Sequence, residues 1–191
     1  MRDPYVDPVS GCLRNRLGIT DAIELQNAER SASLLREQSI RMHGLPGAYD
    51  LAHLQAFHHE IFQDIYPWAG EIRSCELART HAFCRPEFIE TQATQLFSSL
   101  ADENYLSDLA RADFVDRLTY HLSEINAIHP FREGNGRTQR IFFEQLARDA
   151  GNNLDWSQTN QRENVGACIA AIEGDPAHLR ALIERVFGER A

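Results

Sequence analysis

The sequence lacks several signatures that fix a protein's chemistry at once. Its four cysteines form no C-x-x-C pair, which argues against a zinc knuckle or a redox dithiol. It has no G-x-x-x-x-G-K-(S/T) motif for a P-loop, no internal repeat, and no apolar run of membrane-spanning length. The first residues contain no apolar signal core. We therefore expect a soluble, cytoplasmic protein whose cysteines stay reduced.

Positive charge is also scarce. The net charge is -9, and no Lys/Arg block is long enough to follow a phosphate backbone, which disfavours binding to nucleic acid or to an anionic membrane. The histidines His53, His58 and His59 have no HExxH spacing, so we expect a polar helix edge rather than a metal site. Trp68 and Trp156 are expected to anchor the core.

The length of 191 residues, with 43% hydrophobic and 25% charged residues, fits one domain with a substantial core. We expect this single domain to span residues 1–191. Residues 1–19 contain two prolines and two glycines without periodicity, which indicates an extended arm lying over the domain.

Apolar residues at helical spacing dominate the rest of the chain. Thr20 is a plausible N-cap of the first helix, in which the apolar residues Ile23, Ala28, Ala32 and Leu35 recur at helical spacing. Asp50 is expected to cap the second helix. Helices are predicted over about 51–65, 88–100, 112–128, 136–150, 157–173 and 176–187.

Residues 70–86 break this pattern. Two short runs of strand-forming residues on either side of a polar turn predict a short exposed β-hairpin there. Long helices with a single hairpin predict an all-α bundle to which the hairpin is attached.

The segment His129–Arg140 concentrates one base, one carboxylate, three arginines and two glycines between two apolar helices. Gly134 and Gly136 flank Asn135, so consecutive backbone N–H groups can turn inward and form an anion-binding concavity. The helix that begins there adds its positive end to the same place.

The charged side chains of this segment fit a phosphate site. Arg137 and Arg140 lie three residues apart on the first turn of the new helix, where both can reach one oligophosphate. Glu133 is most simply a Mg²⁺ ligand shared with phosphate oxygens. His129 can accept the proton of a hydroxyl whose oxygen attacks phosphorus. A plain glycine-rich helix connection would explain any one of these residues, but it has no use for all of them within twelve positions.

The same segment matches the motif H-x-F-x-(D/E)-G-N-G-R-x-x-R at every fixed position and so resembles the Fic family. Tyr66–Arg73 resembles the W-A-G-x-x-R stretch that leads into the flap hairpin of that family. The resemblance covers about residues 3–187. It implies a Fic-type helical bundle with a flap at 70–86 and a catalytic loop and helix start at 129–140.

The resemblance also implies a role for each motif residue. His129 would be the general base, Phe131 would anchor the loop in the core, and Glu133 would coordinate Mg²⁺. Gly134 and Gly136 would supply an anion hole, and the ATP phosphates would be bound by Asn135, Arg137 and Arg140. A Tyr, Thr or Ser hydroxyl of a target protein docked on the flap would attack the α-phosphorus, and pyrophosphate would leave.

Other activities share much of this site. The kinase-like Doc branch has a lysine near the second motif glycine, whereas this chain has Gly136 followed by Arg137, which favours AMP transfer over phosphorylation. A hydrolase that removes AMP could use the same residues. A nucleotide-sensing binding module is a further alternative, although such a module would not need the base His129.

Fic enzymes are held inactive by a helix with the motif (S/T)-x-x-x-E-(G/N), whose glutamate pairs with the second motif arginine, here Arg140. Glu103 and Glu163 match formally but are expected to be solvated carboxylates of core helices, and Ser33–Gln38 ends in glutamine. The resemblance therefore points to the toxin-type Fic proteins, in which a small antitoxin supplies the glutamate. It also suggests type II topoisomerase subunits as targets.

Overall fold

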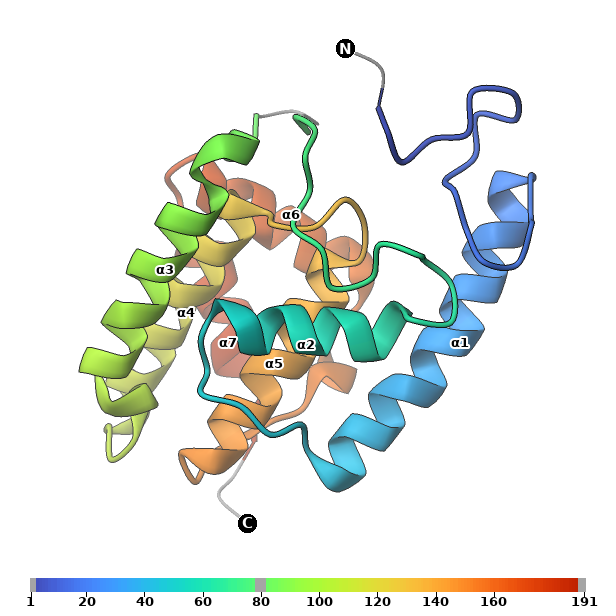
Figure 1. Cartoon of the computed structure of the whole chain (residues 1–191). Coiled ribbons are helices and arrows are strands. Elements are labelled where there is room, and N and C mark those ends of the chain that lie inside the picture. The colour runs from blue at the N-terminus through green and yellow to red at the C-terminus, as the bar shows by residue number, and fades with distance from the viewer. Residues whose placement is uncertain (1–2, 78–81, 189–191) are drawn as a thin grey trace.

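The computed structural model describes residues 3–77 and 82–188, and Figure 1 shows a helical body within these ranges. The all-α class is confirmed. The α-helices are α1 (Ala22–His43), α2 (Leu51–Phe62), α3 (Pro86–Asp102), α4 (Arg111–Ile128), α5 (Asn135–Asp149), α6 (Gln161–Ile172) and α7 (Ala177–Val186). The short 3₁₀-helices are η1 (Asn104–Leu106) and η2 (Trp156–Gln158). The strands β1 (Asn153–Leu154) and β2 (Phe187–Gly188) pair antiparallel, with Leu154 opposite Phe187.

Helix α5 lies at the centre of the body. It packs against α2 and α4, while α1 and α3 lie on opposite sides of α2 (Figure 1). The Phe142 ring of α5 is fully buried and contacts the rings of Phe57 and Phe97 edge-on or tilted, which joins α5 to α2 and α3. The connection between α4 and α5 therefore begins and ends in well-packed helices.

Three helix starts test the capping predictions. Asp50 caps α2 as predicted, since its side chain accepts the His53 N–H. The first helix begins one residue later than predicted because Asp21, not Thr20, accepts the N–H groups of the first turn. Helix α6 begins later than the predicted residue 157 because Asn160 and Glu163 form a capping box there, after the separate turn η2.

The apolar stripe predicted for the first helix is not its buried face. Ile23 and Leu35 are 70% and 69% exposed. The polar residues Glu29 and Ser33 are buried instead, at 6% and 2% exposure. The apolar spacing in the first helix was thus misleading, and the reason lies in the site described below.

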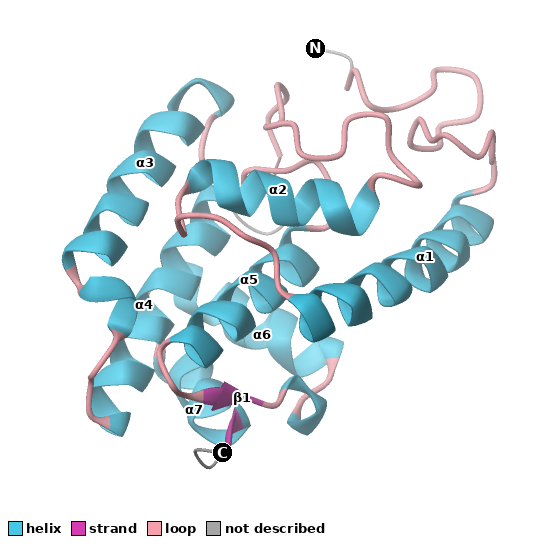
Figure 2. Cartoon of the chain, turned by 60° about the horizontal axis from the view of Figure 1, so that its bottom comes forward, coloured by secondary structure: helices cyan, strands magenta, loops and turns pink. Residues whose placement is uncertain are grey.

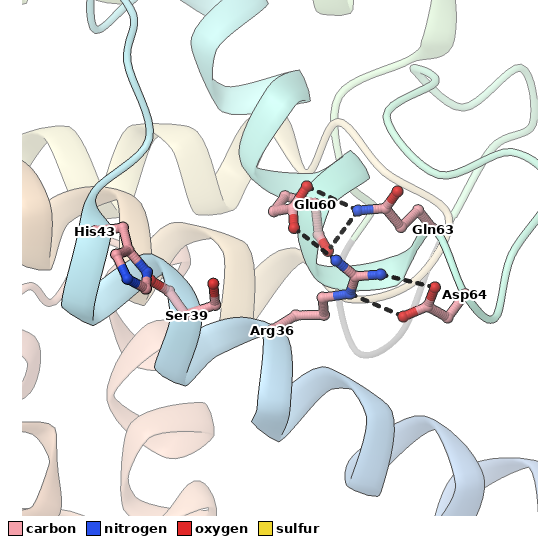
Figure 3. Close-up of polar contacts among 6 residues, drawn as sticks. All are labelled: Arg36, Ser39, His43, Glu60, Gln63 and Asp64. Atoms are coloured by element: carbon pink, nitrogen blue, oxygen red, sulfur yellow. Dashed lines mark hydrogen bonds and ion pairs between the residues drawn. The ribbon is translucent and has the colours of Figure 1, made fainter.

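An ionic cluster fixes α1 against α2 (Figure 3). Arg36 of α1 donates to Glu60 of α2 over 2.9 Å and to both carboxylate oxygens of Asp64 over 2.8 and 2.9 Å. The hydrogen bonds from Arg36 hold the pKa of Asp64 below its usual value. Because Arg36 lies three residues after Ser33, this cluster favours the rotation of α1 that turns Glu29 and Ser33 toward α5.

The predicted β-hairpin at 70–86 is not a regular one in the residues that the structure describes. Residues 78–81, its expected turn, lie outside the described residues. On either side, residues 70–77 and 82–86 contain no strand ladder, and the Phe83 N–H donates to the Leu77 carbonyl over 3.2 Å. Figure 2 shows this α2–α3 connection and the N-terminal arm as loops on one side of the helices.

The N-terminal arm is tied to that connection. The Tyr5 ring packs edge-on against Trp68 at 5.2 Å between centroids, and the Tyr5 hydroxyl accepts the Ser74 N–H over 3.0 Å. Asp3 pairs with Arg132 of the motif segment over 2.8 Å. Across the described ranges, no helix has the length and apolar character needed to cross a membrane.

Candidate active site

His129 is held at the point where α4 ends. Its backbone is left-handed, with φ of 50° and ψ of 62°, and its N–H closes the last turn on the Ile125 carbonyl over 2.9 Å. Its ring Nδ1 lies 3.2 Å from the Asn126 carbonyl oxygen, which can only accept a hydrogen bond. Nδ1 therefore carries the proton, and Nε2 keeps the basic lone pair.

Arg73, from the W-A-G-x-x-R stretch, forms a hydrogen bond with the backbone of His129. Its side chain is fully buried and donates from Nε to the His129 carbonyl over 2.7 Å and from Nη2 to the Ile128 carbonyl over 3.2 Å. It also donates to the carbonyls of Cys75, over 2.7 Å, and Cys84. One guanidinium thus joins both described flanks of the 70–86 segment to the C-terminus of α4, where the helix dipole favours a cation.

His58 and Phe131 support the catalytic loop. Phe131 is fully buried, as its anchoring role requires, and stacks on His58 with 3.9 Å between centroids. His58 Nε2 donates to the Glu133 carbonyl over 3.0 Å, and Nδ1 accepts the Gly70 N–H over 2.7 Å. Burial lowers the pKa of His58 to about 3, so the ring is neutral. The predicted polar helix edge is therefore wrong for His58, and also for His53, which is 3% exposed.

Asn135 and Gly134 shape the turn. The Asn135 side chain accepts the Phe131 N–H over 2.9 Å and donates to the Phe131 carbonyl over 2.7 Å, so both ends of its amide are used inside the loop. Gly134 has φ of 81°, and a Cβ there would lie 2.4 Å from the Phe62 ring. Gly136 lies in the first turn of α5, and a Cβ added there would meet only the Arg140 guanidinium, at 3.4 Å, within 4 Å of it among the described residues. The first N–H groups of α5 have no intrahelical partner and can face a ligand.

Arg137 is held by a buried group on α1. It donates to the Glu29 carboxylate and, over 2.9 Å, to the Ser33 hydroxyl, and its guanidinium lies 4.8 Å from the Phe62 ring centroid. Tyr66 donates to the other Glu29 oxygen. No motif marks Glu29 in the sequence, and Ser33 stands out only as the first residue of the incomplete inhibitory match Ser33–Gln38. The signal that could have found them is a pair of polar residues four apart on a helix that must otherwise bury an apolar face.

Arg140 differs from Arg137 in its partners. Among the residues that the structure describes, it makes no hydrogen bond or ion pair. Burial lowers its pKa, and the nearby charge of Glu37 acts in the opposite direction. Glu37 itself pairs with Arg41 over 3.6 Å. Arg140 is thus the cation of the site with the greatest capacity to bind an added anion.

Glu133 fits a Mg²⁺ ligand in its chemistry. One carboxylate oxygen accepts the Gly134 N–H over 3.0 Å, which leaves the second oxygen for a cation. The described residues contain no group of three or more His, Cys, Asp or Glu side chains arranged to hold a metal. A single carboxylate suits Mg²⁺, which is commonly bound by one or two protein carboxylates together with substrate phosphates and water.

These residues line one cavity of about 760 Å³. Its walls include α1, the loop after α4, the first turns of α5, and the η2–α6 segment. The predicted site residues His129, Glu133, Gly134, Asn135, Gly136, Arg137 and Arg140 all lie on it. So do Phe83, Asn164 and Cys168, and also Trp156, which is partly buried and packs against the core. The volume falls within the range usual for small-molecule sites.

The glutamates that matched the inhibitory pattern are structural. Glu103 pairs with Arg117 over 2.5 Å, and hydrogen bonds from Arg117 lower its pKa to about 2. Glu163 caps α6 and pairs with Arg185 over 3.0 Å. In contrast, Ser33 and Glu37 both line the cavity.

Comparison with known proteins agrees with this geometry. Residues 48–147, just over half of the 191-residue chain, match the Fic/DOC family. The chain belongs to the Fic/DOC family. The matched range ends within α5 and includes the whole 129–140 segment.

Curated relatives match nearly the whole chain. It is 39% identical to the "Probable protein adenylyltransferase Fic" of Salmonella typhimurium, over 98% of this chain and 94% of that protein. It is 38% identical to the "Protein adenylyltransferase VbhT" of Bartonella schoenbuchensis, again over 98% of this chain but only 39% of that longer protein. Several relatives are thus named as protein adenylyltransferases, and this chain is an enzyme of that class.

Solved structures match the whole fold. The BepC protein of Bartonella tribocorum with bound AMPPNP has a TM-score of 0.91 at 25% identity and covers 96% of each chain. The Fic domain of a Bartonella quintana protein with bound ADP has a TM-score of 0.90 at 26% identity, over 96% of this chain and 94% of that one. Two neighbours of the same fold therefore bind adenine nucleotides.

Proposed function

We propose that this protein transfers AMP from ATP to a Tyr, Thr or Ser hydroxyl of a target protein. The observation that supports this best is the cavity in which a base, a carboxylate, a helix N-terminus and two arginines meet. The hydroxyl oxygen forms a bond to the α-phosphorus, and the bond from that phosphorus to pyrophosphate breaks. The hydroxyl proton passes to His129, and pyrophosphate leaves.

His129 is the general base in this proposal. Its Nδ1–H is engaged with the Asn126 carbonyl, so Nε2 is the nitrogen that accepts the proton. Its backbone carbonyl is held by Arg73, which fixes the position of the residue relative to α5. A base held in one place lowers the entropic cost of reaching the attack geometry.

The phosphates are bound by the start of α5 and its arginines. Gly134 and Gly136 let the backbone N–H groups approach a phosphate, and Asn135 contributes its backbone N–H while its side chain holds the loop. Arg137 is pre-oriented by Glu29, and Arg140 supplies a positive charge that has no ion-pair partner among the described residues. Glu133 would hold Mg²⁺, which neutralises phosphate charge when bound.

AMP transfer is favoured over the related activities by two features. Gly136 stands where the kinase-like branch has a lysine, and the chain contains no lysine at all. The side chain of His129 is placed on the cavity with an oriented ring, which a pure nucleotide sensor would not need. Hydrolysis of an AMP-protein ester remains the alternative activity for the same residues.

The test is incubation of the purified chain, and of the His129→Ala variant, with α-labelled ATP, Mg²⁺ and bacterial lysate. We expect label on a protein band with the native chain and none with the variant. Transfer of γ-label without α-label would instead establish a kinase. Release of AMP from a labelled target, without its formation, would establish the hydrolase. Type II topoisomerase subunits are the first purified targets to assay.

We further propose that the protein is the toxin of a toxin–antitoxin pair acting in the cytoplasm. The cavity extends from Arg140 between α1 and α6, and Arg140 has no ion pair among the residues described. A helix from a small partner could place a glutamate there. Expression of the chain from its native locus should yield a complex with a small protein, and purification of the lone chain in an active, growth-arresting form would contradict the proposal.

A further inference from the structure

A phenylalanine covers one face of the His129 ring. The rings of Phe83 and His129 stack with 3.8 Å between centroids and 16° between planes. Phe83 is partly buried and lines the same cavity as His129. Neither the Fic motif nor the W-A-G-x-x-R stretch includes this residue.

Backbone hydrogen bonds hold the chain in place at Phe83 and at the residue after it. Its own N–H donates to the Leu77 carbonyl over 3.2 Å, and the next N–H, that of Cys84, donates to the Ala127 carbonyl of α4 over 3.1 Å. The Cys84 carbonyl in turn accepts from the buried Arg73. Phe83 is therefore attached to the same helix end that presents His129.

This arrangement restricts the imidazole in a way that its hydrogen bond cannot. The Nδ1–H bond to Asn126 fixes one atom of the ring, but rotation about the Cβ–Cγ bond is broad for histidine. A flat ring stacked at van der Waals distance restricts that rotation and keeps water from one face. The edge that carries Nε2 is not part of the stacked face.

We propose that Phe83 is a positioning residue for His129, and that its ring holds the imidazole plane in the orientation from which Nε2 meets the target hydroxyl. This role rests on the proposed AMP transfer. Because Phe83 lies within the 70–86 segment on which a target would dock, the element that binds the target would also orient the base.

The experiment compares Phe83→Ala, Phe83→Leu and Phe83→Tyr with the native chain. Leucine keeps apolar volume without a flat face, and tyrosine keeps the face. We expect kcat for transfer to the labelled target to fall about tenfold in the alanine and leucine variants, with little change in KM for ATP. Phe83→Tyr should retain activity within about twofold of the native chain.

A spectroscopic measurement checks the contact without a target. In protein labelled with ¹⁵N-histidine, His129 is identified by the signal missing from a His129→Gln variant. A stacked aromatic ring shifts the carbon-bound imidazole protons upfield, so this shift should be present in the native chain and in Phe83→Tyr. It should be lost in Phe83→Ala and Phe83→Leu.

Phe88→Ala is the matched control, since Phe88 is 49% exposed at the start of α3 and does not line the cavity. Its kcat should equal that of the native chain. An unchanged kcat in Phe83→Ala, an equal loss in Phe83→Tyr, or the absence of the upfield shift from the native chain would overturn the positioning role. Absence of any transfer by the native chain would overturn the proposed function, and the role of Phe83 with it.

Discussion

The buried guanidinium of Arg73 donates to the backbone carbonyl of His129 over 2.7 Å. These residues are 56 positions apart in the sequence, and the bond places the end of the W-A-G-x-x-R stretch next to His129, the proposed general base. In the described part of the chain, the hydrogen bonds of the Arg73 side chain all go to carbonyls. Arg73 thus links the segment before α3 to the position of His129.

The first prediction concerns the replacement of Arg73 by methionine. This change leaves the carbonyls of His129, Ile128, Cys75 and Cys84 without their donor in a buried place. We expect the free energy of unfolding to fall by about 3 kcal/mol or more. We also expect kcat to fall because His129 loses its backbone support. Urea unfolding and the labelled-ATP assay measure the two effects.

Arg85→Met is the matched control for Arg73. Arg85 has a side chain that is 64% exposed and pairs with Glu87 on the surface over 2.6 Å. Such exposed pairs contribute at most about 1 kcal/mol, so Arg85→Met should unfold nearly as the native chain does. Equal destabilisation by both substitutions would show that the buried bonds of Arg73 have no special role.

The second prediction concerns Glu29, which orients Arg137 and accepts from Tyr66. Glu29→Ala leaves the partly buried Arg137 and the buried Tyr66 hydroxyl without their acceptor. We expect KM for ATP to rise about tenfold because Arg137 loses its fixed orientation, with a smaller rise for Glu29→Gln, which keeps an acceptor. Glu24→Ala, in the exposed first turn of α1, should leave KM unchanged. A lower KM in Glu29→Ala would mean that Glu29 competes with the triphosphate.

The sequence predicted the helices well where apolar spacing decides burial, as in α4 and α5. It misled in α1, where Glu29 and Ser33 are buried and Ile23 and Leu35 are exposed. Burying a carboxylate is costly in general, and the cost at Glu29 is offset because its carboxylate pairs with Arg137. Arg137 is adjacent in space but lies 108 positions away in the sequence. A single helix read in isolation cannot contain that information.

The motif residues themselves were predictable because they lie close together in the sequence. The residues that support them were not. His58, Arg73 and Phe83 reach the loop only through the packing of α2 and of the α2–α3 connection. Their roles follow from long-range contacts, which no local spacing rule describes. Local rules fail most readily at such functional sites.

The third prediction tests the turn at Gly134. Alanine there combines a φ of 81° with a Cβ placed 2.4 Å from the Phe62 ring. We expect Gly134→Ala to destabilise the protein by about 1–3 kcal/mol or more and to abolish transfer, because the start of α5 must shift. Gly166→Ala is the control: it lies within α6 with nothing within 4 Å of its added Cβ. It should stabilise the protein by about 0.5–1 kcal/mol. Thermal unfolding compares them, and a stable, active Gly134→Ala protein would contradict the geometry.

The fourth prediction uses the buried neutral ring of His58. Burial lowers its pKa from 6.5 to about 3, so below pH 6.5 the unfolded chain takes up a proton that the folded chain does not. Stability contributed by the neutral ring is therefore fully present above pH 6.5 and is lost as the pH falls toward 3. As the pH falls from 6.5 to 4.5, His58 should lower the free energy of unfolding by up to about 1.4 kcal/mol for each pH unit.

Urea unfolding of the native chain and of His58→Gln over that pH range isolates this contribution. His53 and His121 also have pKa values lowered by burial, but they act equally in both proteins and cancel in the difference. The variant is expected to be less stable at pH 7, because Glu133 and Gly70 lose their partner, yet to have the shallower pH dependence. Parallel curves for the two proteins would mean that His58 takes up a proton in the folded state as readily as in the unfolded chain. The Glu133 carbonyl, and with it the catalytic loop, would then not depend on a neutral ring.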